Sequence, residues 1–321
     1  MSKPRVLVAH SDIPKKAIQL LQGRCDTIFC PGVRNPSREQ LLSKIEGVDA
    51  LFWFSKVKID KELLDKAGPN LKVVATMSAG YDHIDVKEVK SRGIKIGITP
   101  KVLDAAVADV AMALALAVAR RMPEGRQKIE SKQWETSEPQ WMLGQDFQES
   151  TVGIVGLGGI GQAIARRVKG FDIARLLYTG HSPKPEGEAL NAEFVSLDEL
   201  LKQSDFVFLA CSLNSETVNL INKEALGKMK SNAILVNVSR GGVIDQEALI
   251  EALESRKIWG AGLDVMTPEP LPSDHRLLSI PNCVLLPHLG SATLKTRTNM
   301  ALLTVKNIFA ALDGEPLPSS I

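Results

Sequence analysis

Three short stretches of the sequence carry side chains suited to binding a carboxylate and to acid–base chemistry. NVSRGGVID contains Arg240, GLDVMTPEPLP contains Glu269, and LLPHLGSAT contains His288. Each stretch follows an apolar run, and ligands of parallel α/β sheets bind at the carboxyl ends of the strands. A guanidinium can hold a carboxylate through two hydrogen bonds, and an imidazolium can donate a proton. Singly they fit a surface ion pair, an exposed acid and a capping histidine, but together they favour a catalytic site.

A glycine-rich turn lies upstream of these stretches. VGIVGLGGIGQAIARR places Gly156, Gly158 and Gly161 in the pattern G-x-G-x-x-G. With 24 glycines in 321 residues, chance alone gives roughly 0.1 such patterns in the chain, so the bare pattern is weak evidence. Its context is stronger, because a strand is expected at Val152–Val155 and a helix from Gly161 onward. This context predicts a dinucleotide site with the pyrophosphate at the helix N-terminus, and a turn without a ligand is the alternative.

The segment after the next expected strand indicates which dinucleotide binds. An acid about 20 residues after the glycines usually holds the adenosine ribose, but Thr179 stands here, followed by His181, Ser182 and Lys184. A carboxylate would repel a 2′-phosphate by a few kcal/mol at ~5 Å. Its absence, with basic residues nearby, predicts that NADP(H) is preferred and that NAD(H) is possible. The alternative is that residues 181–184 are only a polar surface loop.

Apolar runs alternate with helical patterns in two series, which predicts two α/β units with parallel sheets covered on both faces. The expected strands are Arg5–His10, Ala50–Phe54, Leu71–Thr76, Val152–Val155, Leu176–Tyr178, Phe206–Ala210, Ile234–Asn237, Gly260–Asp264 and Val284–Leu286. The Ala-rich stretch Asp104–Met122 is expected to be a helix that crosses to the second unit. A helix within Ser291–Leu312 is expected to return to the first. Ser196 and Glu199 form an expected capping box.

Composition excludes several classes of protein. The chain has 39 basic and 37 acidic residues, a net charge of +2, and no dense basic run, which argues against a nucleic-acid partner. Its four cysteines are irregularly spaced, so we expect reduced thiols and no metal site. The apolar part of Asp104–Met122 is too short to span a bilayer, and a buried helix is expected instead. Neither a leader pattern nor a peroxisomal ending is evident, so we expect a cytoplasmic protein.

The stretches quoted above, together with TMSAGYDHID, LLYTGHSPKPE and AGLDVMTPEPLP, resemble the D-isomer-specific 2-hydroxyacid dehydrogenase family over essentially the whole chain. Within it, the resemblance is greatest to the glyoxylate and hydroxypyruvate reductases of animals. It implies an NAD(P)-binding Rossmann domain at 100–287, inserted into a substrate domain formed by 1–99 and 288–321. It also implies a homodimer that reduces glyoxylate to glycolate and hydroxypyruvate to D-glycerate with NADPH.

The resemblance also implies roles for individual residues. His288 is implied as the proton donor, Glu269 as its hydrogen-bonding partner and Arg240 as the residue that grips the substrate. The implied substrate-binding residues are Ala79, Gly80, Arg240, His288 and Ser291. The implied or expected cofactor-binding residues are Gly156, Gly158, Gly159, Ile160, Gly161, Thr179, His181, Ser182, Lys184, Ser212, Val238, Asp264 and Gly290. Asp264 is implied to orient the nicotinamide carboxamide. One departure is Tyr81, where the family commonly has a smaller aliphatic residue.

Other functions remain compatible with the sequence. A short phosphoglycerate dehydrogenase would use the same residues on another 2-hydroxy acid. A transcriptional corepressor of the same superfamily would keep the fold and the nucleotide site as a sensing scaffold, although this chain has no extended disordered tail. Two tryptophans, Trp134 and Trp141, lie in a polar segment. They fit either a cover over a neighbouring subunit's active site or a plug against the Ala-rich helix.

Overall fold

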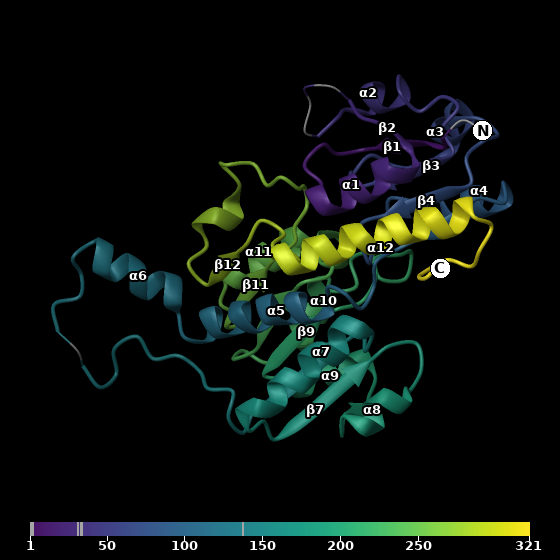
Figure 1. Ribbon diagram of the computed structural model, residues 1–321. Coiled ribbons are helices and arrows are strands. Elements are labelled where there is room, and N and C mark those ends of the chain that lie inside the picture. Colours follow the sequence, from purple (N-terminus) through teal and green to yellow (C-terminus); the bar gives the residue numbers. More distant parts are fainter. Residues whose placement is uncertain (1–2, 31, 33–34, 137) are drawn as a thin grey trace. The chain divides into compact units, whose positions relative to one another are not determined.

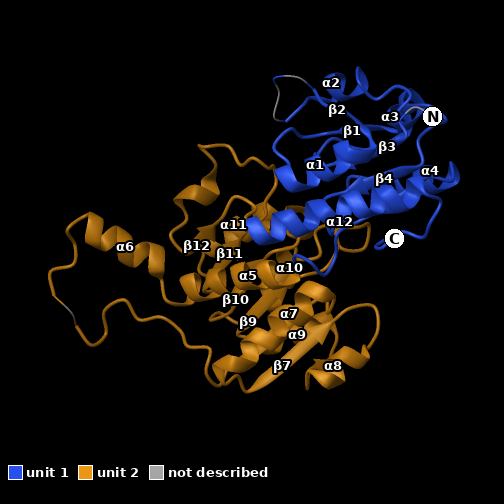
Figure 2. Ribbon diagram, in the orientation of Figure 1, with its two compact units in different colours: residues 1–103, 292–321 blue, residues 104–291 orange. Residues whose placement is uncertain are grey.

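The computed structural model describes residues 3–30, 32, 35–136 and 138–321. The chain divides into two compact units, coloured separately in Figure 2. Unit 1 comprises Met1–Leu103 and Ala292–Ile321, and unit 2 comprises Asp104–Ser291. Each unit is built on a parallel sheet with helical connections, so the predicted fold class is confirmed. Which unit holds which ligand stays a prediction.

Unit 1 contains a parallel sheet of five strands among the residues described. Across the sheet these strands are β2 (Asp26–Ile28), β1 (Arg5–Val8), β3 (Ala50–Trp53), β4 (Val73–Thr76) and β5 (Lys95–Gly97). Its helices are α1 (Lys15–Arg24), α2 (Arg38–Leu42), α3 (Lys61–Ala67), α4 (Val86–Ser91) and α12 (Leu294–Leu312). Every residue of β3 and β4 is buried, as expected for continuous apolar runs in a sheet covered on both faces.

Helix α12 belongs to unit 1, although about 190 residues separate it from the rest of that unit. It packs against β3, β4, β5 and α1, and Figure 1 shows it in yellow beside α1 and β4. Its buried Asn307 donates from Nδ2 to the carbonyl of Ile98 (3.1 Å) and accepts from the amide of Ser319 (3.0 Å). These bonds join the helix to the chain after β5 and to the C-terminal segment.

Unit 2 contains a parallel sheet of seven strands among its described residues. Across the sheet these are β12 (Cys283–Leu285), β11 (Gly260–Leu263), β10 (Ile234–Asn237), β9 (Phe206–Leu209), β6 (Thr151–Val155), β7 (Arg175–Thr179) and β8 (Glu193–Phe194). Its helices are α5 (Asp104–Ala119), α6 (Met122–Glu130), α7 (Gly159–Val168), α8 (Pro185–Ala189), α9 (Leu197–Gln203), α10 (Lys223–Lys228) and α11 (Gln246–Glu254). Short 3₁₀ helices are η1 (Lys169–Phe171), η2 (Gly241–Val243) and η3 (Arg276–Ser279).

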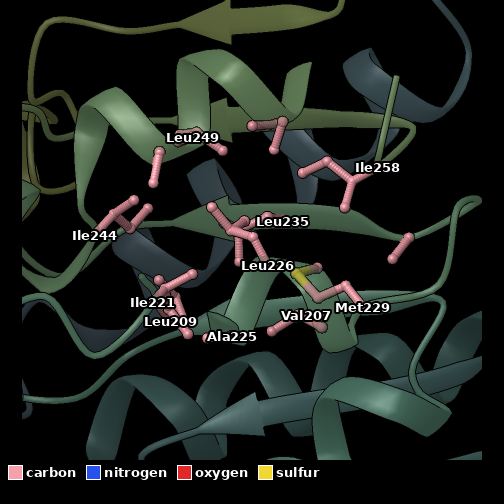
Figure 3. Close-up of a cluster of buried hydrophobic side chains, with 14 of the residues drawn as sticks. Val207, Leu209, Ile221, Ala225, Leu226, Met229, Leu235, Ile244, Leu249 and Ile258 are labelled. Atoms are coloured by element: carbon pink, nitrogen blue, oxygen red, sulfur yellow. The ribbon is translucent and has the colours of Figure 1, made fainter. Parts of the chain in front are cut away.

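Both faces of this second sheet are covered. Ala261 and Leu263 of β11 join a buried cluster with side chains from α9, α10 and α11, part of which is drawn in Figure 3. Gly262 lies between them in the strand and points the other way, where an added Cβ would lie 2.9 Å from the Cβ of Leu114 in α5. Because side chains alternate along a strand, α5 covers the opposite face. The Ala-rich segment is therefore a buried helix, as predicted.

The elements differ from the expected ones mainly at edges and ends. The short strands β2, β5 and β8 were not expected, and β8 has two exposed residues. Helix α5 ends at Ala119 rather than Met122, since Arg121 adopts a left-handed backbone conformation (φ 52°) before α6 begins. The capping box at Ser196 and Glu199 is confirmed. Within the described residues, no helix combines the length and apolarity needed to cross a membrane.

Candidate functional site

The glycine-rich turn connects β6 to α7 in unit 2. Gly156 has a φ of +95°, which disfavours any residue with a side chain, and a Cβ there would lie 2.8 Å from the Cys211 backbone. Gly156 N–H also donates to the carbonyl of Thr179 (2.9 Å). The turn therefore packs closely between the carboxyl end of β7 and the segment that follows β9. Helix α7 starts at Gly159, not at Gly161 as predicted, with Gly158 as its N-cap.

The turn has the room and the donors that a dinucleotide needs. A Cβ placed on Gly158 would meet none of the described atoms within 4 Å, so this position faces open space. The first amides of α7 have no partner inside the helix, and the helix dipole favours an anion at this end. The open side of Gly158 therefore has room for a phosphate, whereas an added Cβ on Gly159 would meet the carboxylate of Asp104. A bound nicotinamide dinucleotide would supply hydride chemistry.

The residues expected to select the cofactor follow β7. Thr179, the last residue of β7, is buried and lies beside the turn through its bond to Gly156. Lys184 donates from Nζ to the carbonyl of Leu157 within the turn (3.3 Å). His181 instead faces a carboxylate, with its Nδ1 3.6 Å from Oε2 of Glu216. The structure thus places Thr179 and Lys184 against the glycine-rich turn. The exposed side chain of His181 lies beside Glu216 instead.

Arg240 follows β10 and is held there by a buried asparagine. Asn237, the last residue of β10, accepts from the amide (3.0 Å) and hydroxyl (2.8 Å) of Ser239 and donates to the carbonyl of Arg240 (2.9 Å). The guanidinium of Arg240 donates from Nη1 to the carbonyl of Ser239 (2.9 Å). Asn237 is a positioning residue that the sequence analysis missed. A buried amide at the end of an apolar strand is the signal that could have found it.

The chain after Arg240 lies directly against the chain that carries Glu269. A Cβ on Gly241 would overlap the backbone of Met266, so only glycine permits this approach. The amide of Met266 in turn donates to Oε1 of Glu269 (3.1 Å). The other oxygen of Glu269, Oε2, lies 3.0 Å from Nδ1 of His288. A continuous series of contacts therefore connects the Arg240 loop to the imidazole of His288.

Asp264 fixes the backbone around His288. Three consecutive amides donate to Asp264: that of His288 to its carbonyl oxygen (2.8 Å), and those of Leu289 (2.6 Å) and Gly290 (2.8 Å) to its carboxylate. His288 has a φ of +57°, a conformation that costs a residue with a side chain on the order of 1–3 kcal/mol unless its surroundings impose it. The three bonds impose it. The ring itself contacts Glu269 through Nδ1, so that Nε2 is the nitrogen suited to proton donation.

Replacing Asp264 with alanine should destabilise unit 2 by about 2–5 kcal/mol. The substitution leaves the buried amide of Gly290 and the partly buried amide of Leu289 without their acceptor, and each such group costs about 1–3 kcal/mol. Burial raises the pKa of the Asp264 carboxyl, although the two amides and the nearby His288 oppose that shift. An asparagine here avoids burying a charge and keeps one acceptor, so Asp264→Asn should lose less. Urea denaturation measures both variants, and equal midpoints for Asp264→Ala and the unmodified protein would contradict this role.

The remaining site residues are distributed as follows. Ser212 and Val238 follow β9 and β10 at the same sheet edge as the turn, and Ser291 ends unit 2. Ala79 and Gly80 follow β4 in unit 1, so their approach to Arg240 and His288 stays a prediction. Trp134 is 55% exposed and Trp141 38%, so neither is buried against α5. Tyr81 is 37% exposed.

With this geometry established, comparison with known proteins is informative. Residues 112–290 match the family described as "D-isomer specific 2-hydroxyacid dehydrogenase, NAD binding domain". The human glyoxylate reductase/hydroxypyruvate reductase is 49% identical over 89% of this chain and 87% of its own length. The chain belongs to the D-isomer-specific 2-hydroxyacid dehydrogenase family. It is thus an NAD(P)-dependent oxidoreductase, and the predicted family is confirmed.

Other members of this family match along nearly the whole chain. The glyoxylate reductase of Thermococcus kodakarensis is 45% identical, with 99% of this chain and 96% of that protein covered. A Thermus thermophilus protein of known structure superposes with a TM-score of 0.90 at 43% identity, covering 99% of both chains. The NADPH-dependent glyoxylate/hydroxypyruvate reductase of Sinorhizobium meliloti, in complex with NADP and malonate, gives a TM-score of 0.86 at 31% identity, with 100% and 97% covered.

Proposed function

We propose that this dehydrogenase is an NADPH-preferring reductase of glyoxylate and hydroxypyruvate, forming glycolate and D-glycerate. The observation that carries the proposal is the contact between His288 and Glu269, joined through Met266 to the Arg240 loop. An acid, its partner and a carboxylate-binding cation thus share one unit with the dinucleotide turn. Relatives named glyoxylate reductase, and the malonate-bound structure of one of them, support a small acid as substrate.

Each residue has a role that follows from its chemistry. Arg240 binds the substrate carboxylate and stabilises the charge that develops on the carbonyl oxygen. Bound NADPH would supply the hydride. Protonated His288 donates its Nε2 proton to the carbonyl oxygen, and the Glu269 carboxylate stabilises the imidazolium at Nδ1. The product is a 2-hydroxy acid.

Replacing Thr179 with aspartate should lower the preference for NADPH over NADH by about 10- to 100-fold. A carboxylate at the end of β7 would repel the 2′-phosphate and would accept hydrogen bonds from the free ribose hydroxyl of NADH. The measurement is the ratio of kcat/KM values for the two cofactors at saturating glyoxylate. Thr179→Asn has a similar size and no charge, so it is the matched control. An unchanged ratio in Thr179→Asp would refute the assignment of this position.

The substrate assignment is tested by a steady-state assay with four candidate substrates and both cofactors. We expect the highest kcat/KM with glyoxylate or hydroxypyruvate and NADPH. A higher value with phosphoglycerate, measured in the oxidative direction, would favour a short phosphoglycerate dehydrogenase. Turnover of phosphite would point to another dehydrogenase, and lack of turnover with all four would favour a nucleotide-sensing scaffold. A homodimer and a cytoplasmic location also stay predictions.

A further inference from the structure

Tyr178 is a buried side chain that neither the sequence analysis nor the proposed mechanism uses. It is the penultimate residue of β7 and is 3% exposed. Its hydroxyl accepts a hydrogen bond from the amide of Lys184 (2.9 Å) and lies 3.5 Å from the carbonyl of the same residue. A tyrosine hydroxyl at the end of a buried strand therefore holds the backbone of the basic residue expected to select the cofactor.

The ring of Tyr178 is fixed from two sides, so its hydroxyl has a defined position. Phe194 of β8 packs against it with ring centroids 5.3 Å apart. Gly187 of α8 lies so close that an added Cβ would be 2.6 Å from the Tyr178 hydroxyl oxygen. A side chain at 187 would push the ring away. The packing of β7, β8 and α8 thus fixes the Tyr178 hydroxyl, and this hydroxyl holds the backbone of Lys184.

From that anchored backbone, the side chain of Lys184 returns to the glycine-rich turn. Its Nζ donates to the carbonyl of Leu157 (3.3 Å), between Gly156 and Gly158. An ammonium group has three N–H donors, so this bond still lets Lys184 donate to a phosphate. A lysine side chain loses much conformational entropy when a ligand fixes it. Because the backbone of Lys184 is already held in place, less entropy is lost when the cofactor binds.

We propose that Tyr178 is a positioning residue for cofactor selectivity, which anchors Lys184 so that its ammonium group meets the 2′-phosphate of NADP(H). This inference rests on the proposed preference for NADPH. It differs from simple core packing, because it assigns the hydroxyl, and not the ring, to selectivity. Tyr178→Phe removes only the hydroxyl and keeps the ring against Phe194 and Gly187.

The experiment measures the binding of two small probes by isothermal titration calorimetry. Adenosine 2′,5′-bisphosphate carries the 2′-phosphate, and 5′-AMP lacks it. Tyr178→Phe should weaken the first about 3- to 10-fold and leave the second unchanged, since one hydrogen bond to a neutral group is lost. In the steady state, the KM for NADPH should rise with little change in kcat, because ground-state binding is what changes. Lys184→Ala should weaken the bisphosphate at least as much.

The double variant distinguishes the inference from its alternatives. If Tyr178 acts through Lys184, then Tyr178→Phe has no further effect on the bisphosphate once Lys184 is alanine. Additive losses, or equal weakening of both probes, would overturn the inference. If Lys184→Ala weakens bisphosphate binding and Tyr178→Phe does not, the inference fails and the proposed preference stands. If Lys184→Ala has no effect, the assignment of Lys184 fails and the inference fails with it.

Lys202 provides a control for the loss of one positive charge from unit 2. Lys202 lies in the last turn of α9, which precedes β9 and so lies near the amino ends of the strands, away from the turn. Lys202→Ala should leave the affinity for both probes unchanged. Equal weakening of bisphosphate binding by Lys202→Ala and Lys184→Ala would show a general charge effect and overturn the inference.

Discussion

Replacing His288 with asparagine should lower kcat for glyoxylate reduction by about 10²- to 10⁴-fold, while the affinity for NADPH stays nearly unchanged. The substitution removes the proposed proton donor. Asparagine is chosen because it accepts the left-handed backbone of this position (φ +57°) better than alanine does. Stopped-flow measurement of the hydride-transfer step and fluorescence titration with NADPH separate the two effects.

Two further observations control this prediction. Thermal unfolding of His288→Asn should match that of the unmodified protein, because the three amides that donate to Asp264 belong to the backbone and remain. Glu269→Gln keeps a side chain that can accept from Nδ1 but removes its charge, so a smaller loss of kcat is expected. Unchanged hydride transfer in His288→Asn would remove this histidine from the mechanism.

Replacing Arg240 with alanine should lower kcat/KM for glyoxylate by on the order of 10²- to 10⁴-fold, through both a higher KM and a lower kcat. The guanidinium is proposed to contact the carboxylate in the ground state and the developing oxyanion in the transition state, so both constants change. Arg240→Lys should recover little, because an ammonium group cannot make the two parallel bonds of a guanidinium.

A second arginine of the same unit provides the comparison for this effect. Arg276 is largely exposed and forms ion pairs with Glu247 and Glu254 on α11. Arg276→Ala removes the same charge from unit 2, and we expect kcat/KM for glyoxylate to stay within about twofold, since exposed pairs contribute about 0–1 kcal/mol. If both substitutions reduced kcat/KM equally, or if Arg240→Ala changed neither constant, Arg240 would not bind substrate.

The expected effects at His288 and Arg240 depend on how rigidly unit 2 positions these two side chains. Asp264, Asn237 and Gly241 contribute no proton transfer themselves, yet they determine where His288 and Arg240 lie. Asp264 and Asn237 hydrogen-bond to backbone atoms, and Gly241 packs against the backbone of Met266. The positions of the two functional side chains therefore depend on contacts at the strand ends. Residues that position a site in this way affect the rate, because a displacement of the reacting groups by about 1 Å costs on the order of 10²-fold.

The parts of this protein that depend on local residue patterns could be predicted from its amino-acid sequence. Runs such as ALFW at Ala50–Trp53 and ILVN at Ile234–Asn237 are short and apolar at every or nearly every position, as expected for strands buried on both faces. The glycine pattern after β6 likewise depends on neighbouring residues. Charged residues directly after such runs could be placed at the carboxyl ends of strands without knowing the strand order. The strands β2, β5 and β8 lie at sheet edges and are only two or three residues long, too short for such a run to stand out.

Which of these residues contact one another could be seen only in the folded chain. Nothing in the spacing of Asp264 and His288 predicts that three consecutive amides donate to one aspartate, and nothing near Tyr178 predicts that its hydroxyl holds Lys184. Such contacts join loops that follow different strands, and loop conformation depends on the packing beneath the loop as well as on its own sequence. The chemistry could therefore be predicted from the residue types at the strand ends. The contacts that position these residues could be found only in the folded structure.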